Sequence, residues 1–183
     1  MRRILSVSLA VAMVMTSARD AAPATTLAPL TRAQVQAFMA SPTRHVRAVD
    51  KRVSAAIAEG LRRSGTFTQL VLALDRSDVI VYVETGRKLP ATVAGRLLLV
   101  ARPEGPRYLR IQVTEGPHPH DLIALVAHEL RHALEVAESA DVRDDRTLIA
   151  LYEKIGHIRR GAHHFDTLAA QDTAKQVRSE LAG

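Results

Sequence analysis

The chain has 183 residues, a formal net charge of +6 and no cysteine, and only 3% of its residues are aromatic. This length supports one hydrophobic core rather than two, and the absence of cysteine excludes a disulfide framework. The positive residues are scattered along the chain and few aromatic rings are present for stacking on bases. The composition therefore predicts no nucleic acid partner.

The N-terminus has the pattern of a secretory signal peptide over residues 1–18. An arginine pair precedes a short apolar run, and small residues follow as far as Ala18, the expected cleavage site, with Ala22 and Ala24 as other candidates. The apolar run is shorter than the roughly 20 residues needed to cross a bilayer. We therefore expect a secreted or periplasmic protein that is not membrane-embedded, with residues 19–30, rich in Ala, Thr and Pro, as a flexible lead-in.

A single domain is expected over residues 31–183, and it begins with helical patterns. Thr31 is placed to cap a short helix that ends near Met39. Asp50 is placed to cap a second helix that continues through Leu61 and is closed by Gly65. A third, shorter stripe of apolar residues covers residues 67–74. These patterns predict three helices before the first strand.

The middle of the chain has the period of strands. The last two apolar runs are separated by a short link that contains Pro103, Gly105 and Pro106. Such a short link favours an antiparallel hairpin. Three runs have the β-branched or leucine-rich composition of strands: residues 78–84, 96–101 and 108–113.

The chain is expected to be helical after these strands. One helix should begin near Asp121, as its N-cap, and end near Glu138, and two more should cover residues 146–157 and 164–181. Helices, then strands, then helices indicate an α+β fold rather than alternating βαβ units. The prediction is a small, three-stranded, mainly antiparallel sheet with a helical C-terminal half.

A His-Glu-x-x-His motif lies in the first of these C-terminal helices. His128 and His132 are four residues apart, so their imidazoles point the same way from a helix and can share one metal ion. Glu129 lies on the neighbouring face, where its carboxylate can take a proton from water activated by that metal. The motif therefore predicts a Zn²⁺ site with Glu129 as the general base.

A catalytic zinc site usually has a third protein ligand, and Asp166 is the first candidate for it. It is expected to open the last helix and is followed by small residues that allow close approach to another helix. Glu135 lies on the histidine face but about 10 Å along the axis from His128, too far to share one ion on a straight helix. The alternatives that the sequence leaves open are Glu153, Glu138, Asp141 and His163.

Residues 126–170 resemble the zincin class of metallopeptidases, in particular the gluzincin-like and aspzincin-like branch whose third ligand is a downstream carboxylate. The resemblance rests on AHELRH at 127–132 and FDTLAA at 165–170. It implies a zincin-like fold, zinc bound by His128 and His132, and water activation by Glu129. The chain looks most similar to small secreted bacterial proteins of this type.

The expected function is therefore an exported zinc-dependent peptidase that acts on a peptide or protein substrate. The alternative is a zinc-stabilised binding or structural protein with a zincin-like fold and no catalysis. A third possibility is a basic surface-binding protein in which the motif is incidental. Glu129 favours the first, because a purely structural site does not need it. Candidates for a donor to the transition-state oxyanion are Tyr152, His157, His163, His164 and Arg131.

Overall fold

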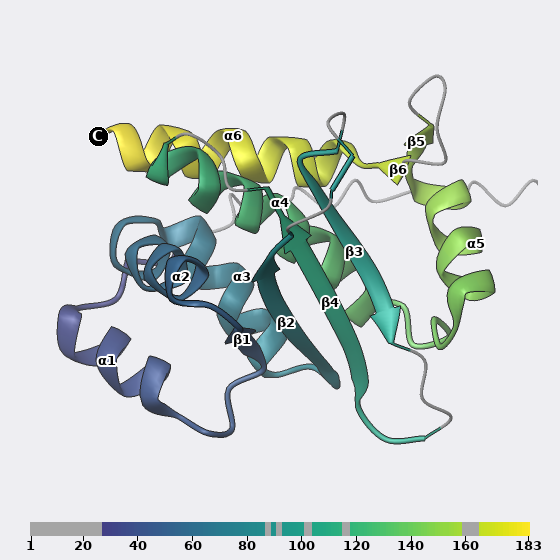
Figure 1. Ribbon diagram of the computed structural model, residues 1–183, viewed down its shortest axis with the longest axis horizontal. Coiled ribbons are helices and arrows are strands. Elements are labelled where there is room, and N and C mark those ends of the chain that lie inside the picture. Colours follow the sequence, from purple (N-terminus) through teal and green to yellow (C-terminus); the bar gives the residue numbers. More distant parts are fainter. Residues whose placement is uncertain (1–26, 87–88, 91–92, 101–103, 115–117, 159–164) are drawn as a thin grey trace, which may run out of the picture.

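Six helices, a four-stranded mixed sheet and a small two-stranded sheet make up the described part of the chain (Figure 1). The computed structural model describes residues 27–86, 89–90, 93–100, 104–114, 118–158 and 165–183. The expected signal peptide and most of the lead-in lie outside these residues. The α+β class is confirmed. No helix among the described residues has the length and hydropathy needed to cross a membrane.

The N-terminal helices begin where the sequence predicts. Thr31 caps α1 (Arg32–Ala40) through a reciprocal capping box with Gln34. Asp50 caps α2 (Lys51–Arg63), and its second oxygen accepts from the backbone N–H and the hydroxyl of Thr85. A capping carboxylate thus also fastens this helix to the end of a strand.

The helix α3 follows α2 almost without a break, as Gly65–Asp75. Ser64 ends α2 and caps α3, accepting from Phe67 N at 2.9 Å. Gly65 was expected to close the second helix, but it is the first residue of the third, because the Ser64 side chain supplies the start signal that the glycine lacks.

The main sheet has four strands in the order β1-β2-β4-β3, and two of its three pairings are parallel. The expected hairpin is confirmed, since β3 and β4 are antiparallel, but the expectation of a three-stranded, mainly antiparallel sheet is wrong. The chain passes from β2 to the far edge before β4 returns between them, so β2 and β4 run parallel. The strands are β1 (Val46–Ala48), β2 (Val79–Thr85), β3 (Gly95–Val100) and β4 (Arg107–Val113).

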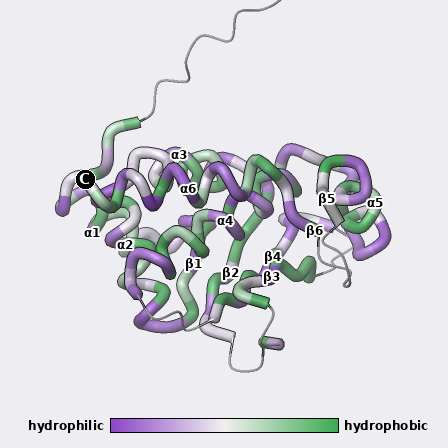
Figure 2. Tube along the Cα trace, turned by 90° about the horizontal axis from the view of Figure 1, so that it is seen from above, coloured by the Kyte–Doolittle hydropathy of each residue, from purple (hydrophilic) through white to green (hydrophobic). Residues whose placement is uncertain are grey.

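One face of this sheet forms the core with the helices. Along β4, Leu109, Ile111 and Val113 are buried, whereas Arg110 is exposed on the other face. The longest helix, α4 (Pro119–Ala137), lies between the sheet and α6 (Leu168–Ala182), as the view from above shows (Figure 2). This burial on two sides explains why eleven residues of α4 are buried.

The start of α4 differs from the prediction, although its end near Glu138 does not. Asp121 was expected as the N-cap, but His118 occupies that position and makes no capping bond through its side chain. Pro119 begins the helix because its fixed φ suits the first helical position and its missing N–H has no helical partner there. Asp121 therefore lies in the first turn.

The C-terminal segment also departs from the expected helix boundaries. After α5 (Asp145–Ile155), two short strands, β5 (His157–Ile158) and β6 (Phe165–Asp166), pair antiparallel with His157 opposite Asp166. Asp166 was expected to open the last helix, but it lies in β6. The helix begins after Thr167, whose hydroxyl accepts from Ala170 N at 3.1 Å. Strands of two residues are too short to produce a period in the sequence.

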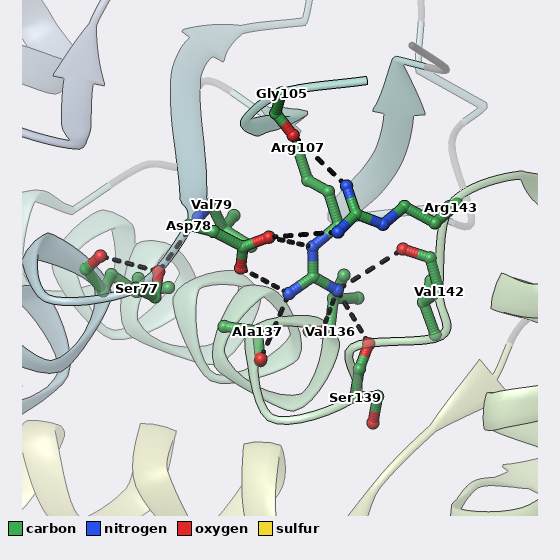
Figure 3. Close-up of polar contacts among 11 residues, drawn as sticks. Ser77, Asp78, Val79, Gly105, Arg107, Val136, Ala137, Ser139, Val142 and Arg143 are labelled. Atoms are coloured by element: carbon green, nitrogen blue, oxygen red, sulfur yellow. Dashed lines mark hydrogen bonds and ion pairs between the residues drawn. The ribbon is translucent and has the colours of Figure 1, made fainter. Parts of the chain in front are cut away.

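One buried arginine fastens the end of α4 to the sheet (Figure 3). Arg107, at the start of β4, is 4% exposed and forms a bidentate pair with Asp78, with Nε 2.9 Å from Oδ2. Its other N–H groups donate to backbone carbonyls at and beyond the end of α4. These carbonyls belong to Val136, Ala137, Ser139 and Val142. The guanidinium thereby adds a donor to these carbonyls, of which Val136 O also accepts from Ser139 N and Ser139 O from Val142 N.

Replacing this arginine by Arg107→Met should lower the free energy of unfolding by about 2–3 kcal/mol, because the carbonyls at the end of α4 lose their side-chain donor while the half-exposed Asp78 is resolvated. Urea denaturation measures the change. The matched control is Arg143→Ala, since Arg143 is 45% exposed and lies 3.8 Å from the same carboxylate. The control should cost less than about 1 kcal/mol, and an equal cost for both variants would contradict this account.

The same pair should make stability depend on pH in the acid range. Hydrogen bonds from Arg107, and then its charge, outweigh partial burial and hold the pKa of Asp78 below its usual value. A lowered folded-state pKa contributes stability that is present above the unfolded pKa and is lost as the pH falls through the folded pKa. Asp78→Asn should therefore destabilise the protein at about pH 6 more than at about pH 2, as urea midpoints at each pH would show.

Candidate metal centre

The structure brings two histidines of α4 and one aspartate of β6 into a single cluster. His128 and His132 have ring centroids 4.9 Å apart, one helical turn from each other. Asp166 Oδ1 lies 3.4 Å from His128 Nε2 and 3.9 Å from His132 Nε2. The three ligand atoms all lie within 4.8 Å of one another, and they form the one such group found among the described residues.

The separation of His128 and Asp166 is that of neighbouring ligands of a tetrahedral zinc ion, whereas His132 Nε2, 3.9 Å from Asp166 Oδ1, would have to move closer. Bonds of about 2.0–2.1 Å at tetrahedral angles place neighbouring donors roughly 3.3 Å apart, close to the distance between His128 and Asp166. Two imidazole nitrogens and one carboxylate oxygen are also donors that zinc accepts, and three protein ligands leave a fourth position open. The side chains of His128 and Asp166 are 19% and 13% exposed, so the cluster reaches the surface.

Asp166 is oriented toward the histidines by its neighbours. Gln171, one turn into α6, donates to Asp166 Oδ2 at 2.9 Å, and the other carboxylate oxygen faces the imidazoles. The alternative ligands predicted from the sequence are not in this cluster. Glu138, Asp141 and Glu153 are exposed elsewhere, and His163 lies outside the described residues.

The pKa values of the two histidines are shifted in opposite directions. Burial, and then the neighbouring His132, lower the pKa of His128, outweighing the opposing effect of Asp166. Burial alone would lower the pKa of His132 too, but its hydrogen bond to Glu135 and the nearby carboxylates raise it. His128 is therefore neutral near pH 7, the form in which an imidazole binds a metal.

Glu129 lies beside the cluster on the face of α4 that meets the sheet. Only 5% of it is exposed, and burial raises its pKa to about 7, with Asp166 adding to the rise and His132 opposing it. A carboxylate with a pKa near neutrality can both accept and release a proton. The position and the pKa are those of a general acid–base group.

Gly95, at the start of β3, makes room for this carboxylate, a role that the sequence analysis missed. A Cβ at position 95 would lie 2.9 Å from Glu129 Cδ and 3.1 Å from Cγ, closer than atoms pack. The available signal was an isolated glycine at the edge of a strand pattern, which often marks a close approach. The expected strand began one residue later.

Tyr152 was a candidate oxyanion donor, but the structure gives its hydroxyl another contact. The ring is buried against the edge of the His132 imidazole, and its hydroxyl donates to the His132 backbone carbonyl at 3.2 Å. Arg131, a second candidate, pairs with two glutamates of its own helix. The side chains of His157, His163 and His164 lie outside the described residues.

The contact between Gly95 and Glu129 can be tested by stability measurements. Gly95→Ala should cost about 1–3 kcal/mol, because the added methyl group overpacks the carboxylate. In a Glu129→Ala background the same change should cost almost nothing, which a double-mutant cycle measures by urea denaturation. Gly86→Ala is the control, since its Cβ would crowd Leu89 and Gln112 rather than Glu129, so its cost should be the same in both backgrounds. A cost that is equal in both backgrounds would contradict the contact.

Comparisons with protein-family models, with curated proteins and with solved structures find no match to this chain. The chemistry of the centre is therefore inferred from its own geometry. The cluster of His128, His132 and Asp166, with Glu129 beside it, is the observation from which that inference starts.

Proposed function

We propose that this chain is a zinc-dependent peptidase with a zincin-like active site. The observation that carries the proposal is the assembly of His128, His132 and Asp166 next to a buried Glu129 whose pKa is near neutrality. A zinc ion in that position would supply a Lewis acid that activates water and polarises a peptide carbonyl. The expected signal peptide adds that the protein acts outside the cytoplasm.

The protein's own residues divide the remaining work. His128, His132 and Asp166 would hold the ion and leave one position open to water. Glu129 would accept the proton of the attacking water and pass it to the leaving amine, a double role that suits a pKa of about 7. Gly95 would hold the strand close enough to keep this carboxylate in place.

The edge of the sheet supports a peptide as substrate. Among the described strands, β3 pairs only with β4, so its other side is open. Thr114 N donates to Ala94 O, so the next residues turned toward β4 are 96, 98 and 100. The backbone groups of residues 95, 97 and 99 therefore point to the open side, where an extended peptide can pair with them. Gly95 brings this edge beside Glu129.

The second candidate is a zinc-stabilised binding protein without catalysis, which would use the same three ligands. Catalysis is favoured because a structural zinc site usually has four protein ligands, whereas this cluster offers three. A buried carboxylate next to the open position is also costly for a protein that makes no use of it.

Elemental analysis after gel filtration, combined with cleavage of a peptide library, tests the proposal. We expect about one zinc per chain, lost in His132→Ala and in Asp166→Ala. Glu129→Gln should keep the zinc but lower kcat by about 100-fold or more, because the general base is removed. Glu153→Gln, an exposed glutamate on α5, is the control and should behave as the native protein.

The outcomes separate the candidate functions. Zinc without cleavage by the native protein would support the binding protein instead. Native cleavage rates in Glu129→Gln would refute the role of the base, and a native protein that takes up no zinc would refute the metal centre.

A further inference from the structure

We infer that Glu135 is a positioning residue that couples the two halves of the metal centre, the histidines on α4 and the segment that carries Asp166. The inference rests on the proposed metal site. Glu135 is 5% exposed, and its two oxygens bond to different elements of the fold. It therefore acts through the ligands, without touching the metal or the substrate.

The first half of the coupling fixes the imidazole of His132. Glu135 Oε2 lies 2.8 Å from His132 Nδ1. Because a carboxylate only accepts, Nδ1 carries the proton of the neutral ring, and the lone pair of Nε2 is then left for the metal. Nε2 is the nitrogen that faces Asp166. Carboxylates that hold ligand histidines in this way also fix the ring orientation.

The second half fixes the turn from β6 into α6. Thr167, the residue after Asp166, donates through its hydroxyl to Glu135 Oε1 at 2.7 Å. The same hydroxyl accepts from Ala170 N and so caps α6. The carboxylate of Glu135 thus sets the position of the backbone immediately beside the third ligand.

The bonds of Glu135 also explain why it is not a ligand itself. Both oxygens already accept, and Arg131 Nε lies 3.7 Å from Oε1, so the buried charge is compensated by neighbouring donors. A metal bond would require the carboxylate to leave His132 or Thr167. The sequence excludes Glu135 by distance along the helix, and the structure gives it a different task.

Glu135 and Thr167 are buried but also line a cleft of about 340 Å³, together with Arg131, Leu151 and Leu168. Side chains that border a cleft depend on their hydrogen bonds for a fixed position. Loss of either bond should therefore let His132 and Asp166 move relative to each other.

Zinc affinity, measured by competition with a chromophoric chelator, tests the inference. Glu135→Gln should weaken zinc binding about 10- to 100-fold. The amide has only one oxygen to accept with, so it cannot accept from both His132 and Thr167 in the way that the two carboxylate oxygens do. Glu138→Gln is the matched control, since Glu138 is on the same helix and also pairs with Arg131, but its side chain is 56% exposed. The control should bind zinc as the native protein does.

Substitutions of Thr167 provide an independent arm if Glu135→Gln fails to fold. Thr167→Val removes the hydroxyl and should weaken zinc binding in the same direction, whereas Thr167→Ser keeps the hydroxyl and should restore native affinity. The double variant Glu135→Gln/Thr167→Val should lose less than the product of the two single losses, because the two groups share one bond.

The failure of this inference differs from the failure of the proposed function. If the native protein binds no zinc, the metal centre itself is refuted. If the native protein binds zinc and both Glu135→Gln and Thr167→Val bind it with native affinity, Glu135 has no positioning role and only the inference is overturned.

Discussion

The position of α4 relative to the sheet is the constraint on which the rest of the structure depends, and Arg107 sets it at one end. A single guanidinium joins Asp78, next to β2, to the last carbonyls of the helix (Figure 3). Since α4 carries both histidines and Glu129, a rotation or slide of this helix would move Glu129 away from Gly95 of β3. The polar bonds fix the position and the apolar core on both sides supplies most of the stability.

The sequence predicts the fold well wherever the signal is local. Thr31 and Asp50 cap helices as expected, and the β3–β4 hairpin forms across its Pro-Gly link. Strand pairing is different, because it depends on contacts between segments that are distant in the chain. The parallel pairing of β2 with β4 has no local signal, and the three residues of β1 are too few to show a period.

The candidate site was likewise predicted only where the signal in the sequence is local. Helical spacing is sufficient to place His128, Glu129 and His132 together, and small residues near Asp166 suggested the close approach that the structure contains. The role of Gly95 could not be predicted from spacing. What matters at this position is that glycine has no Cβ, and this becomes important only because β3 faces Glu129. The bond between Glu135 and Thr167 likewise depends on where the chain returns after α5.

That return has a consequence for the energetics of metal uptake. Hydrogen bonds that include Glu135, Thr167 and Gln171 hold the candidate ligand atoms close together. These bonds belong to the fold itself, so the entropic cost of closing the long segment between His132 and Asp166 would be met by folding rather than by a bound metal. Small zinc modules fold only when the metal binds. If zinc binds to the cluster as proposed, its ligands are ordered by the fold beforehand, and the domain should stay folded when the ion is removed.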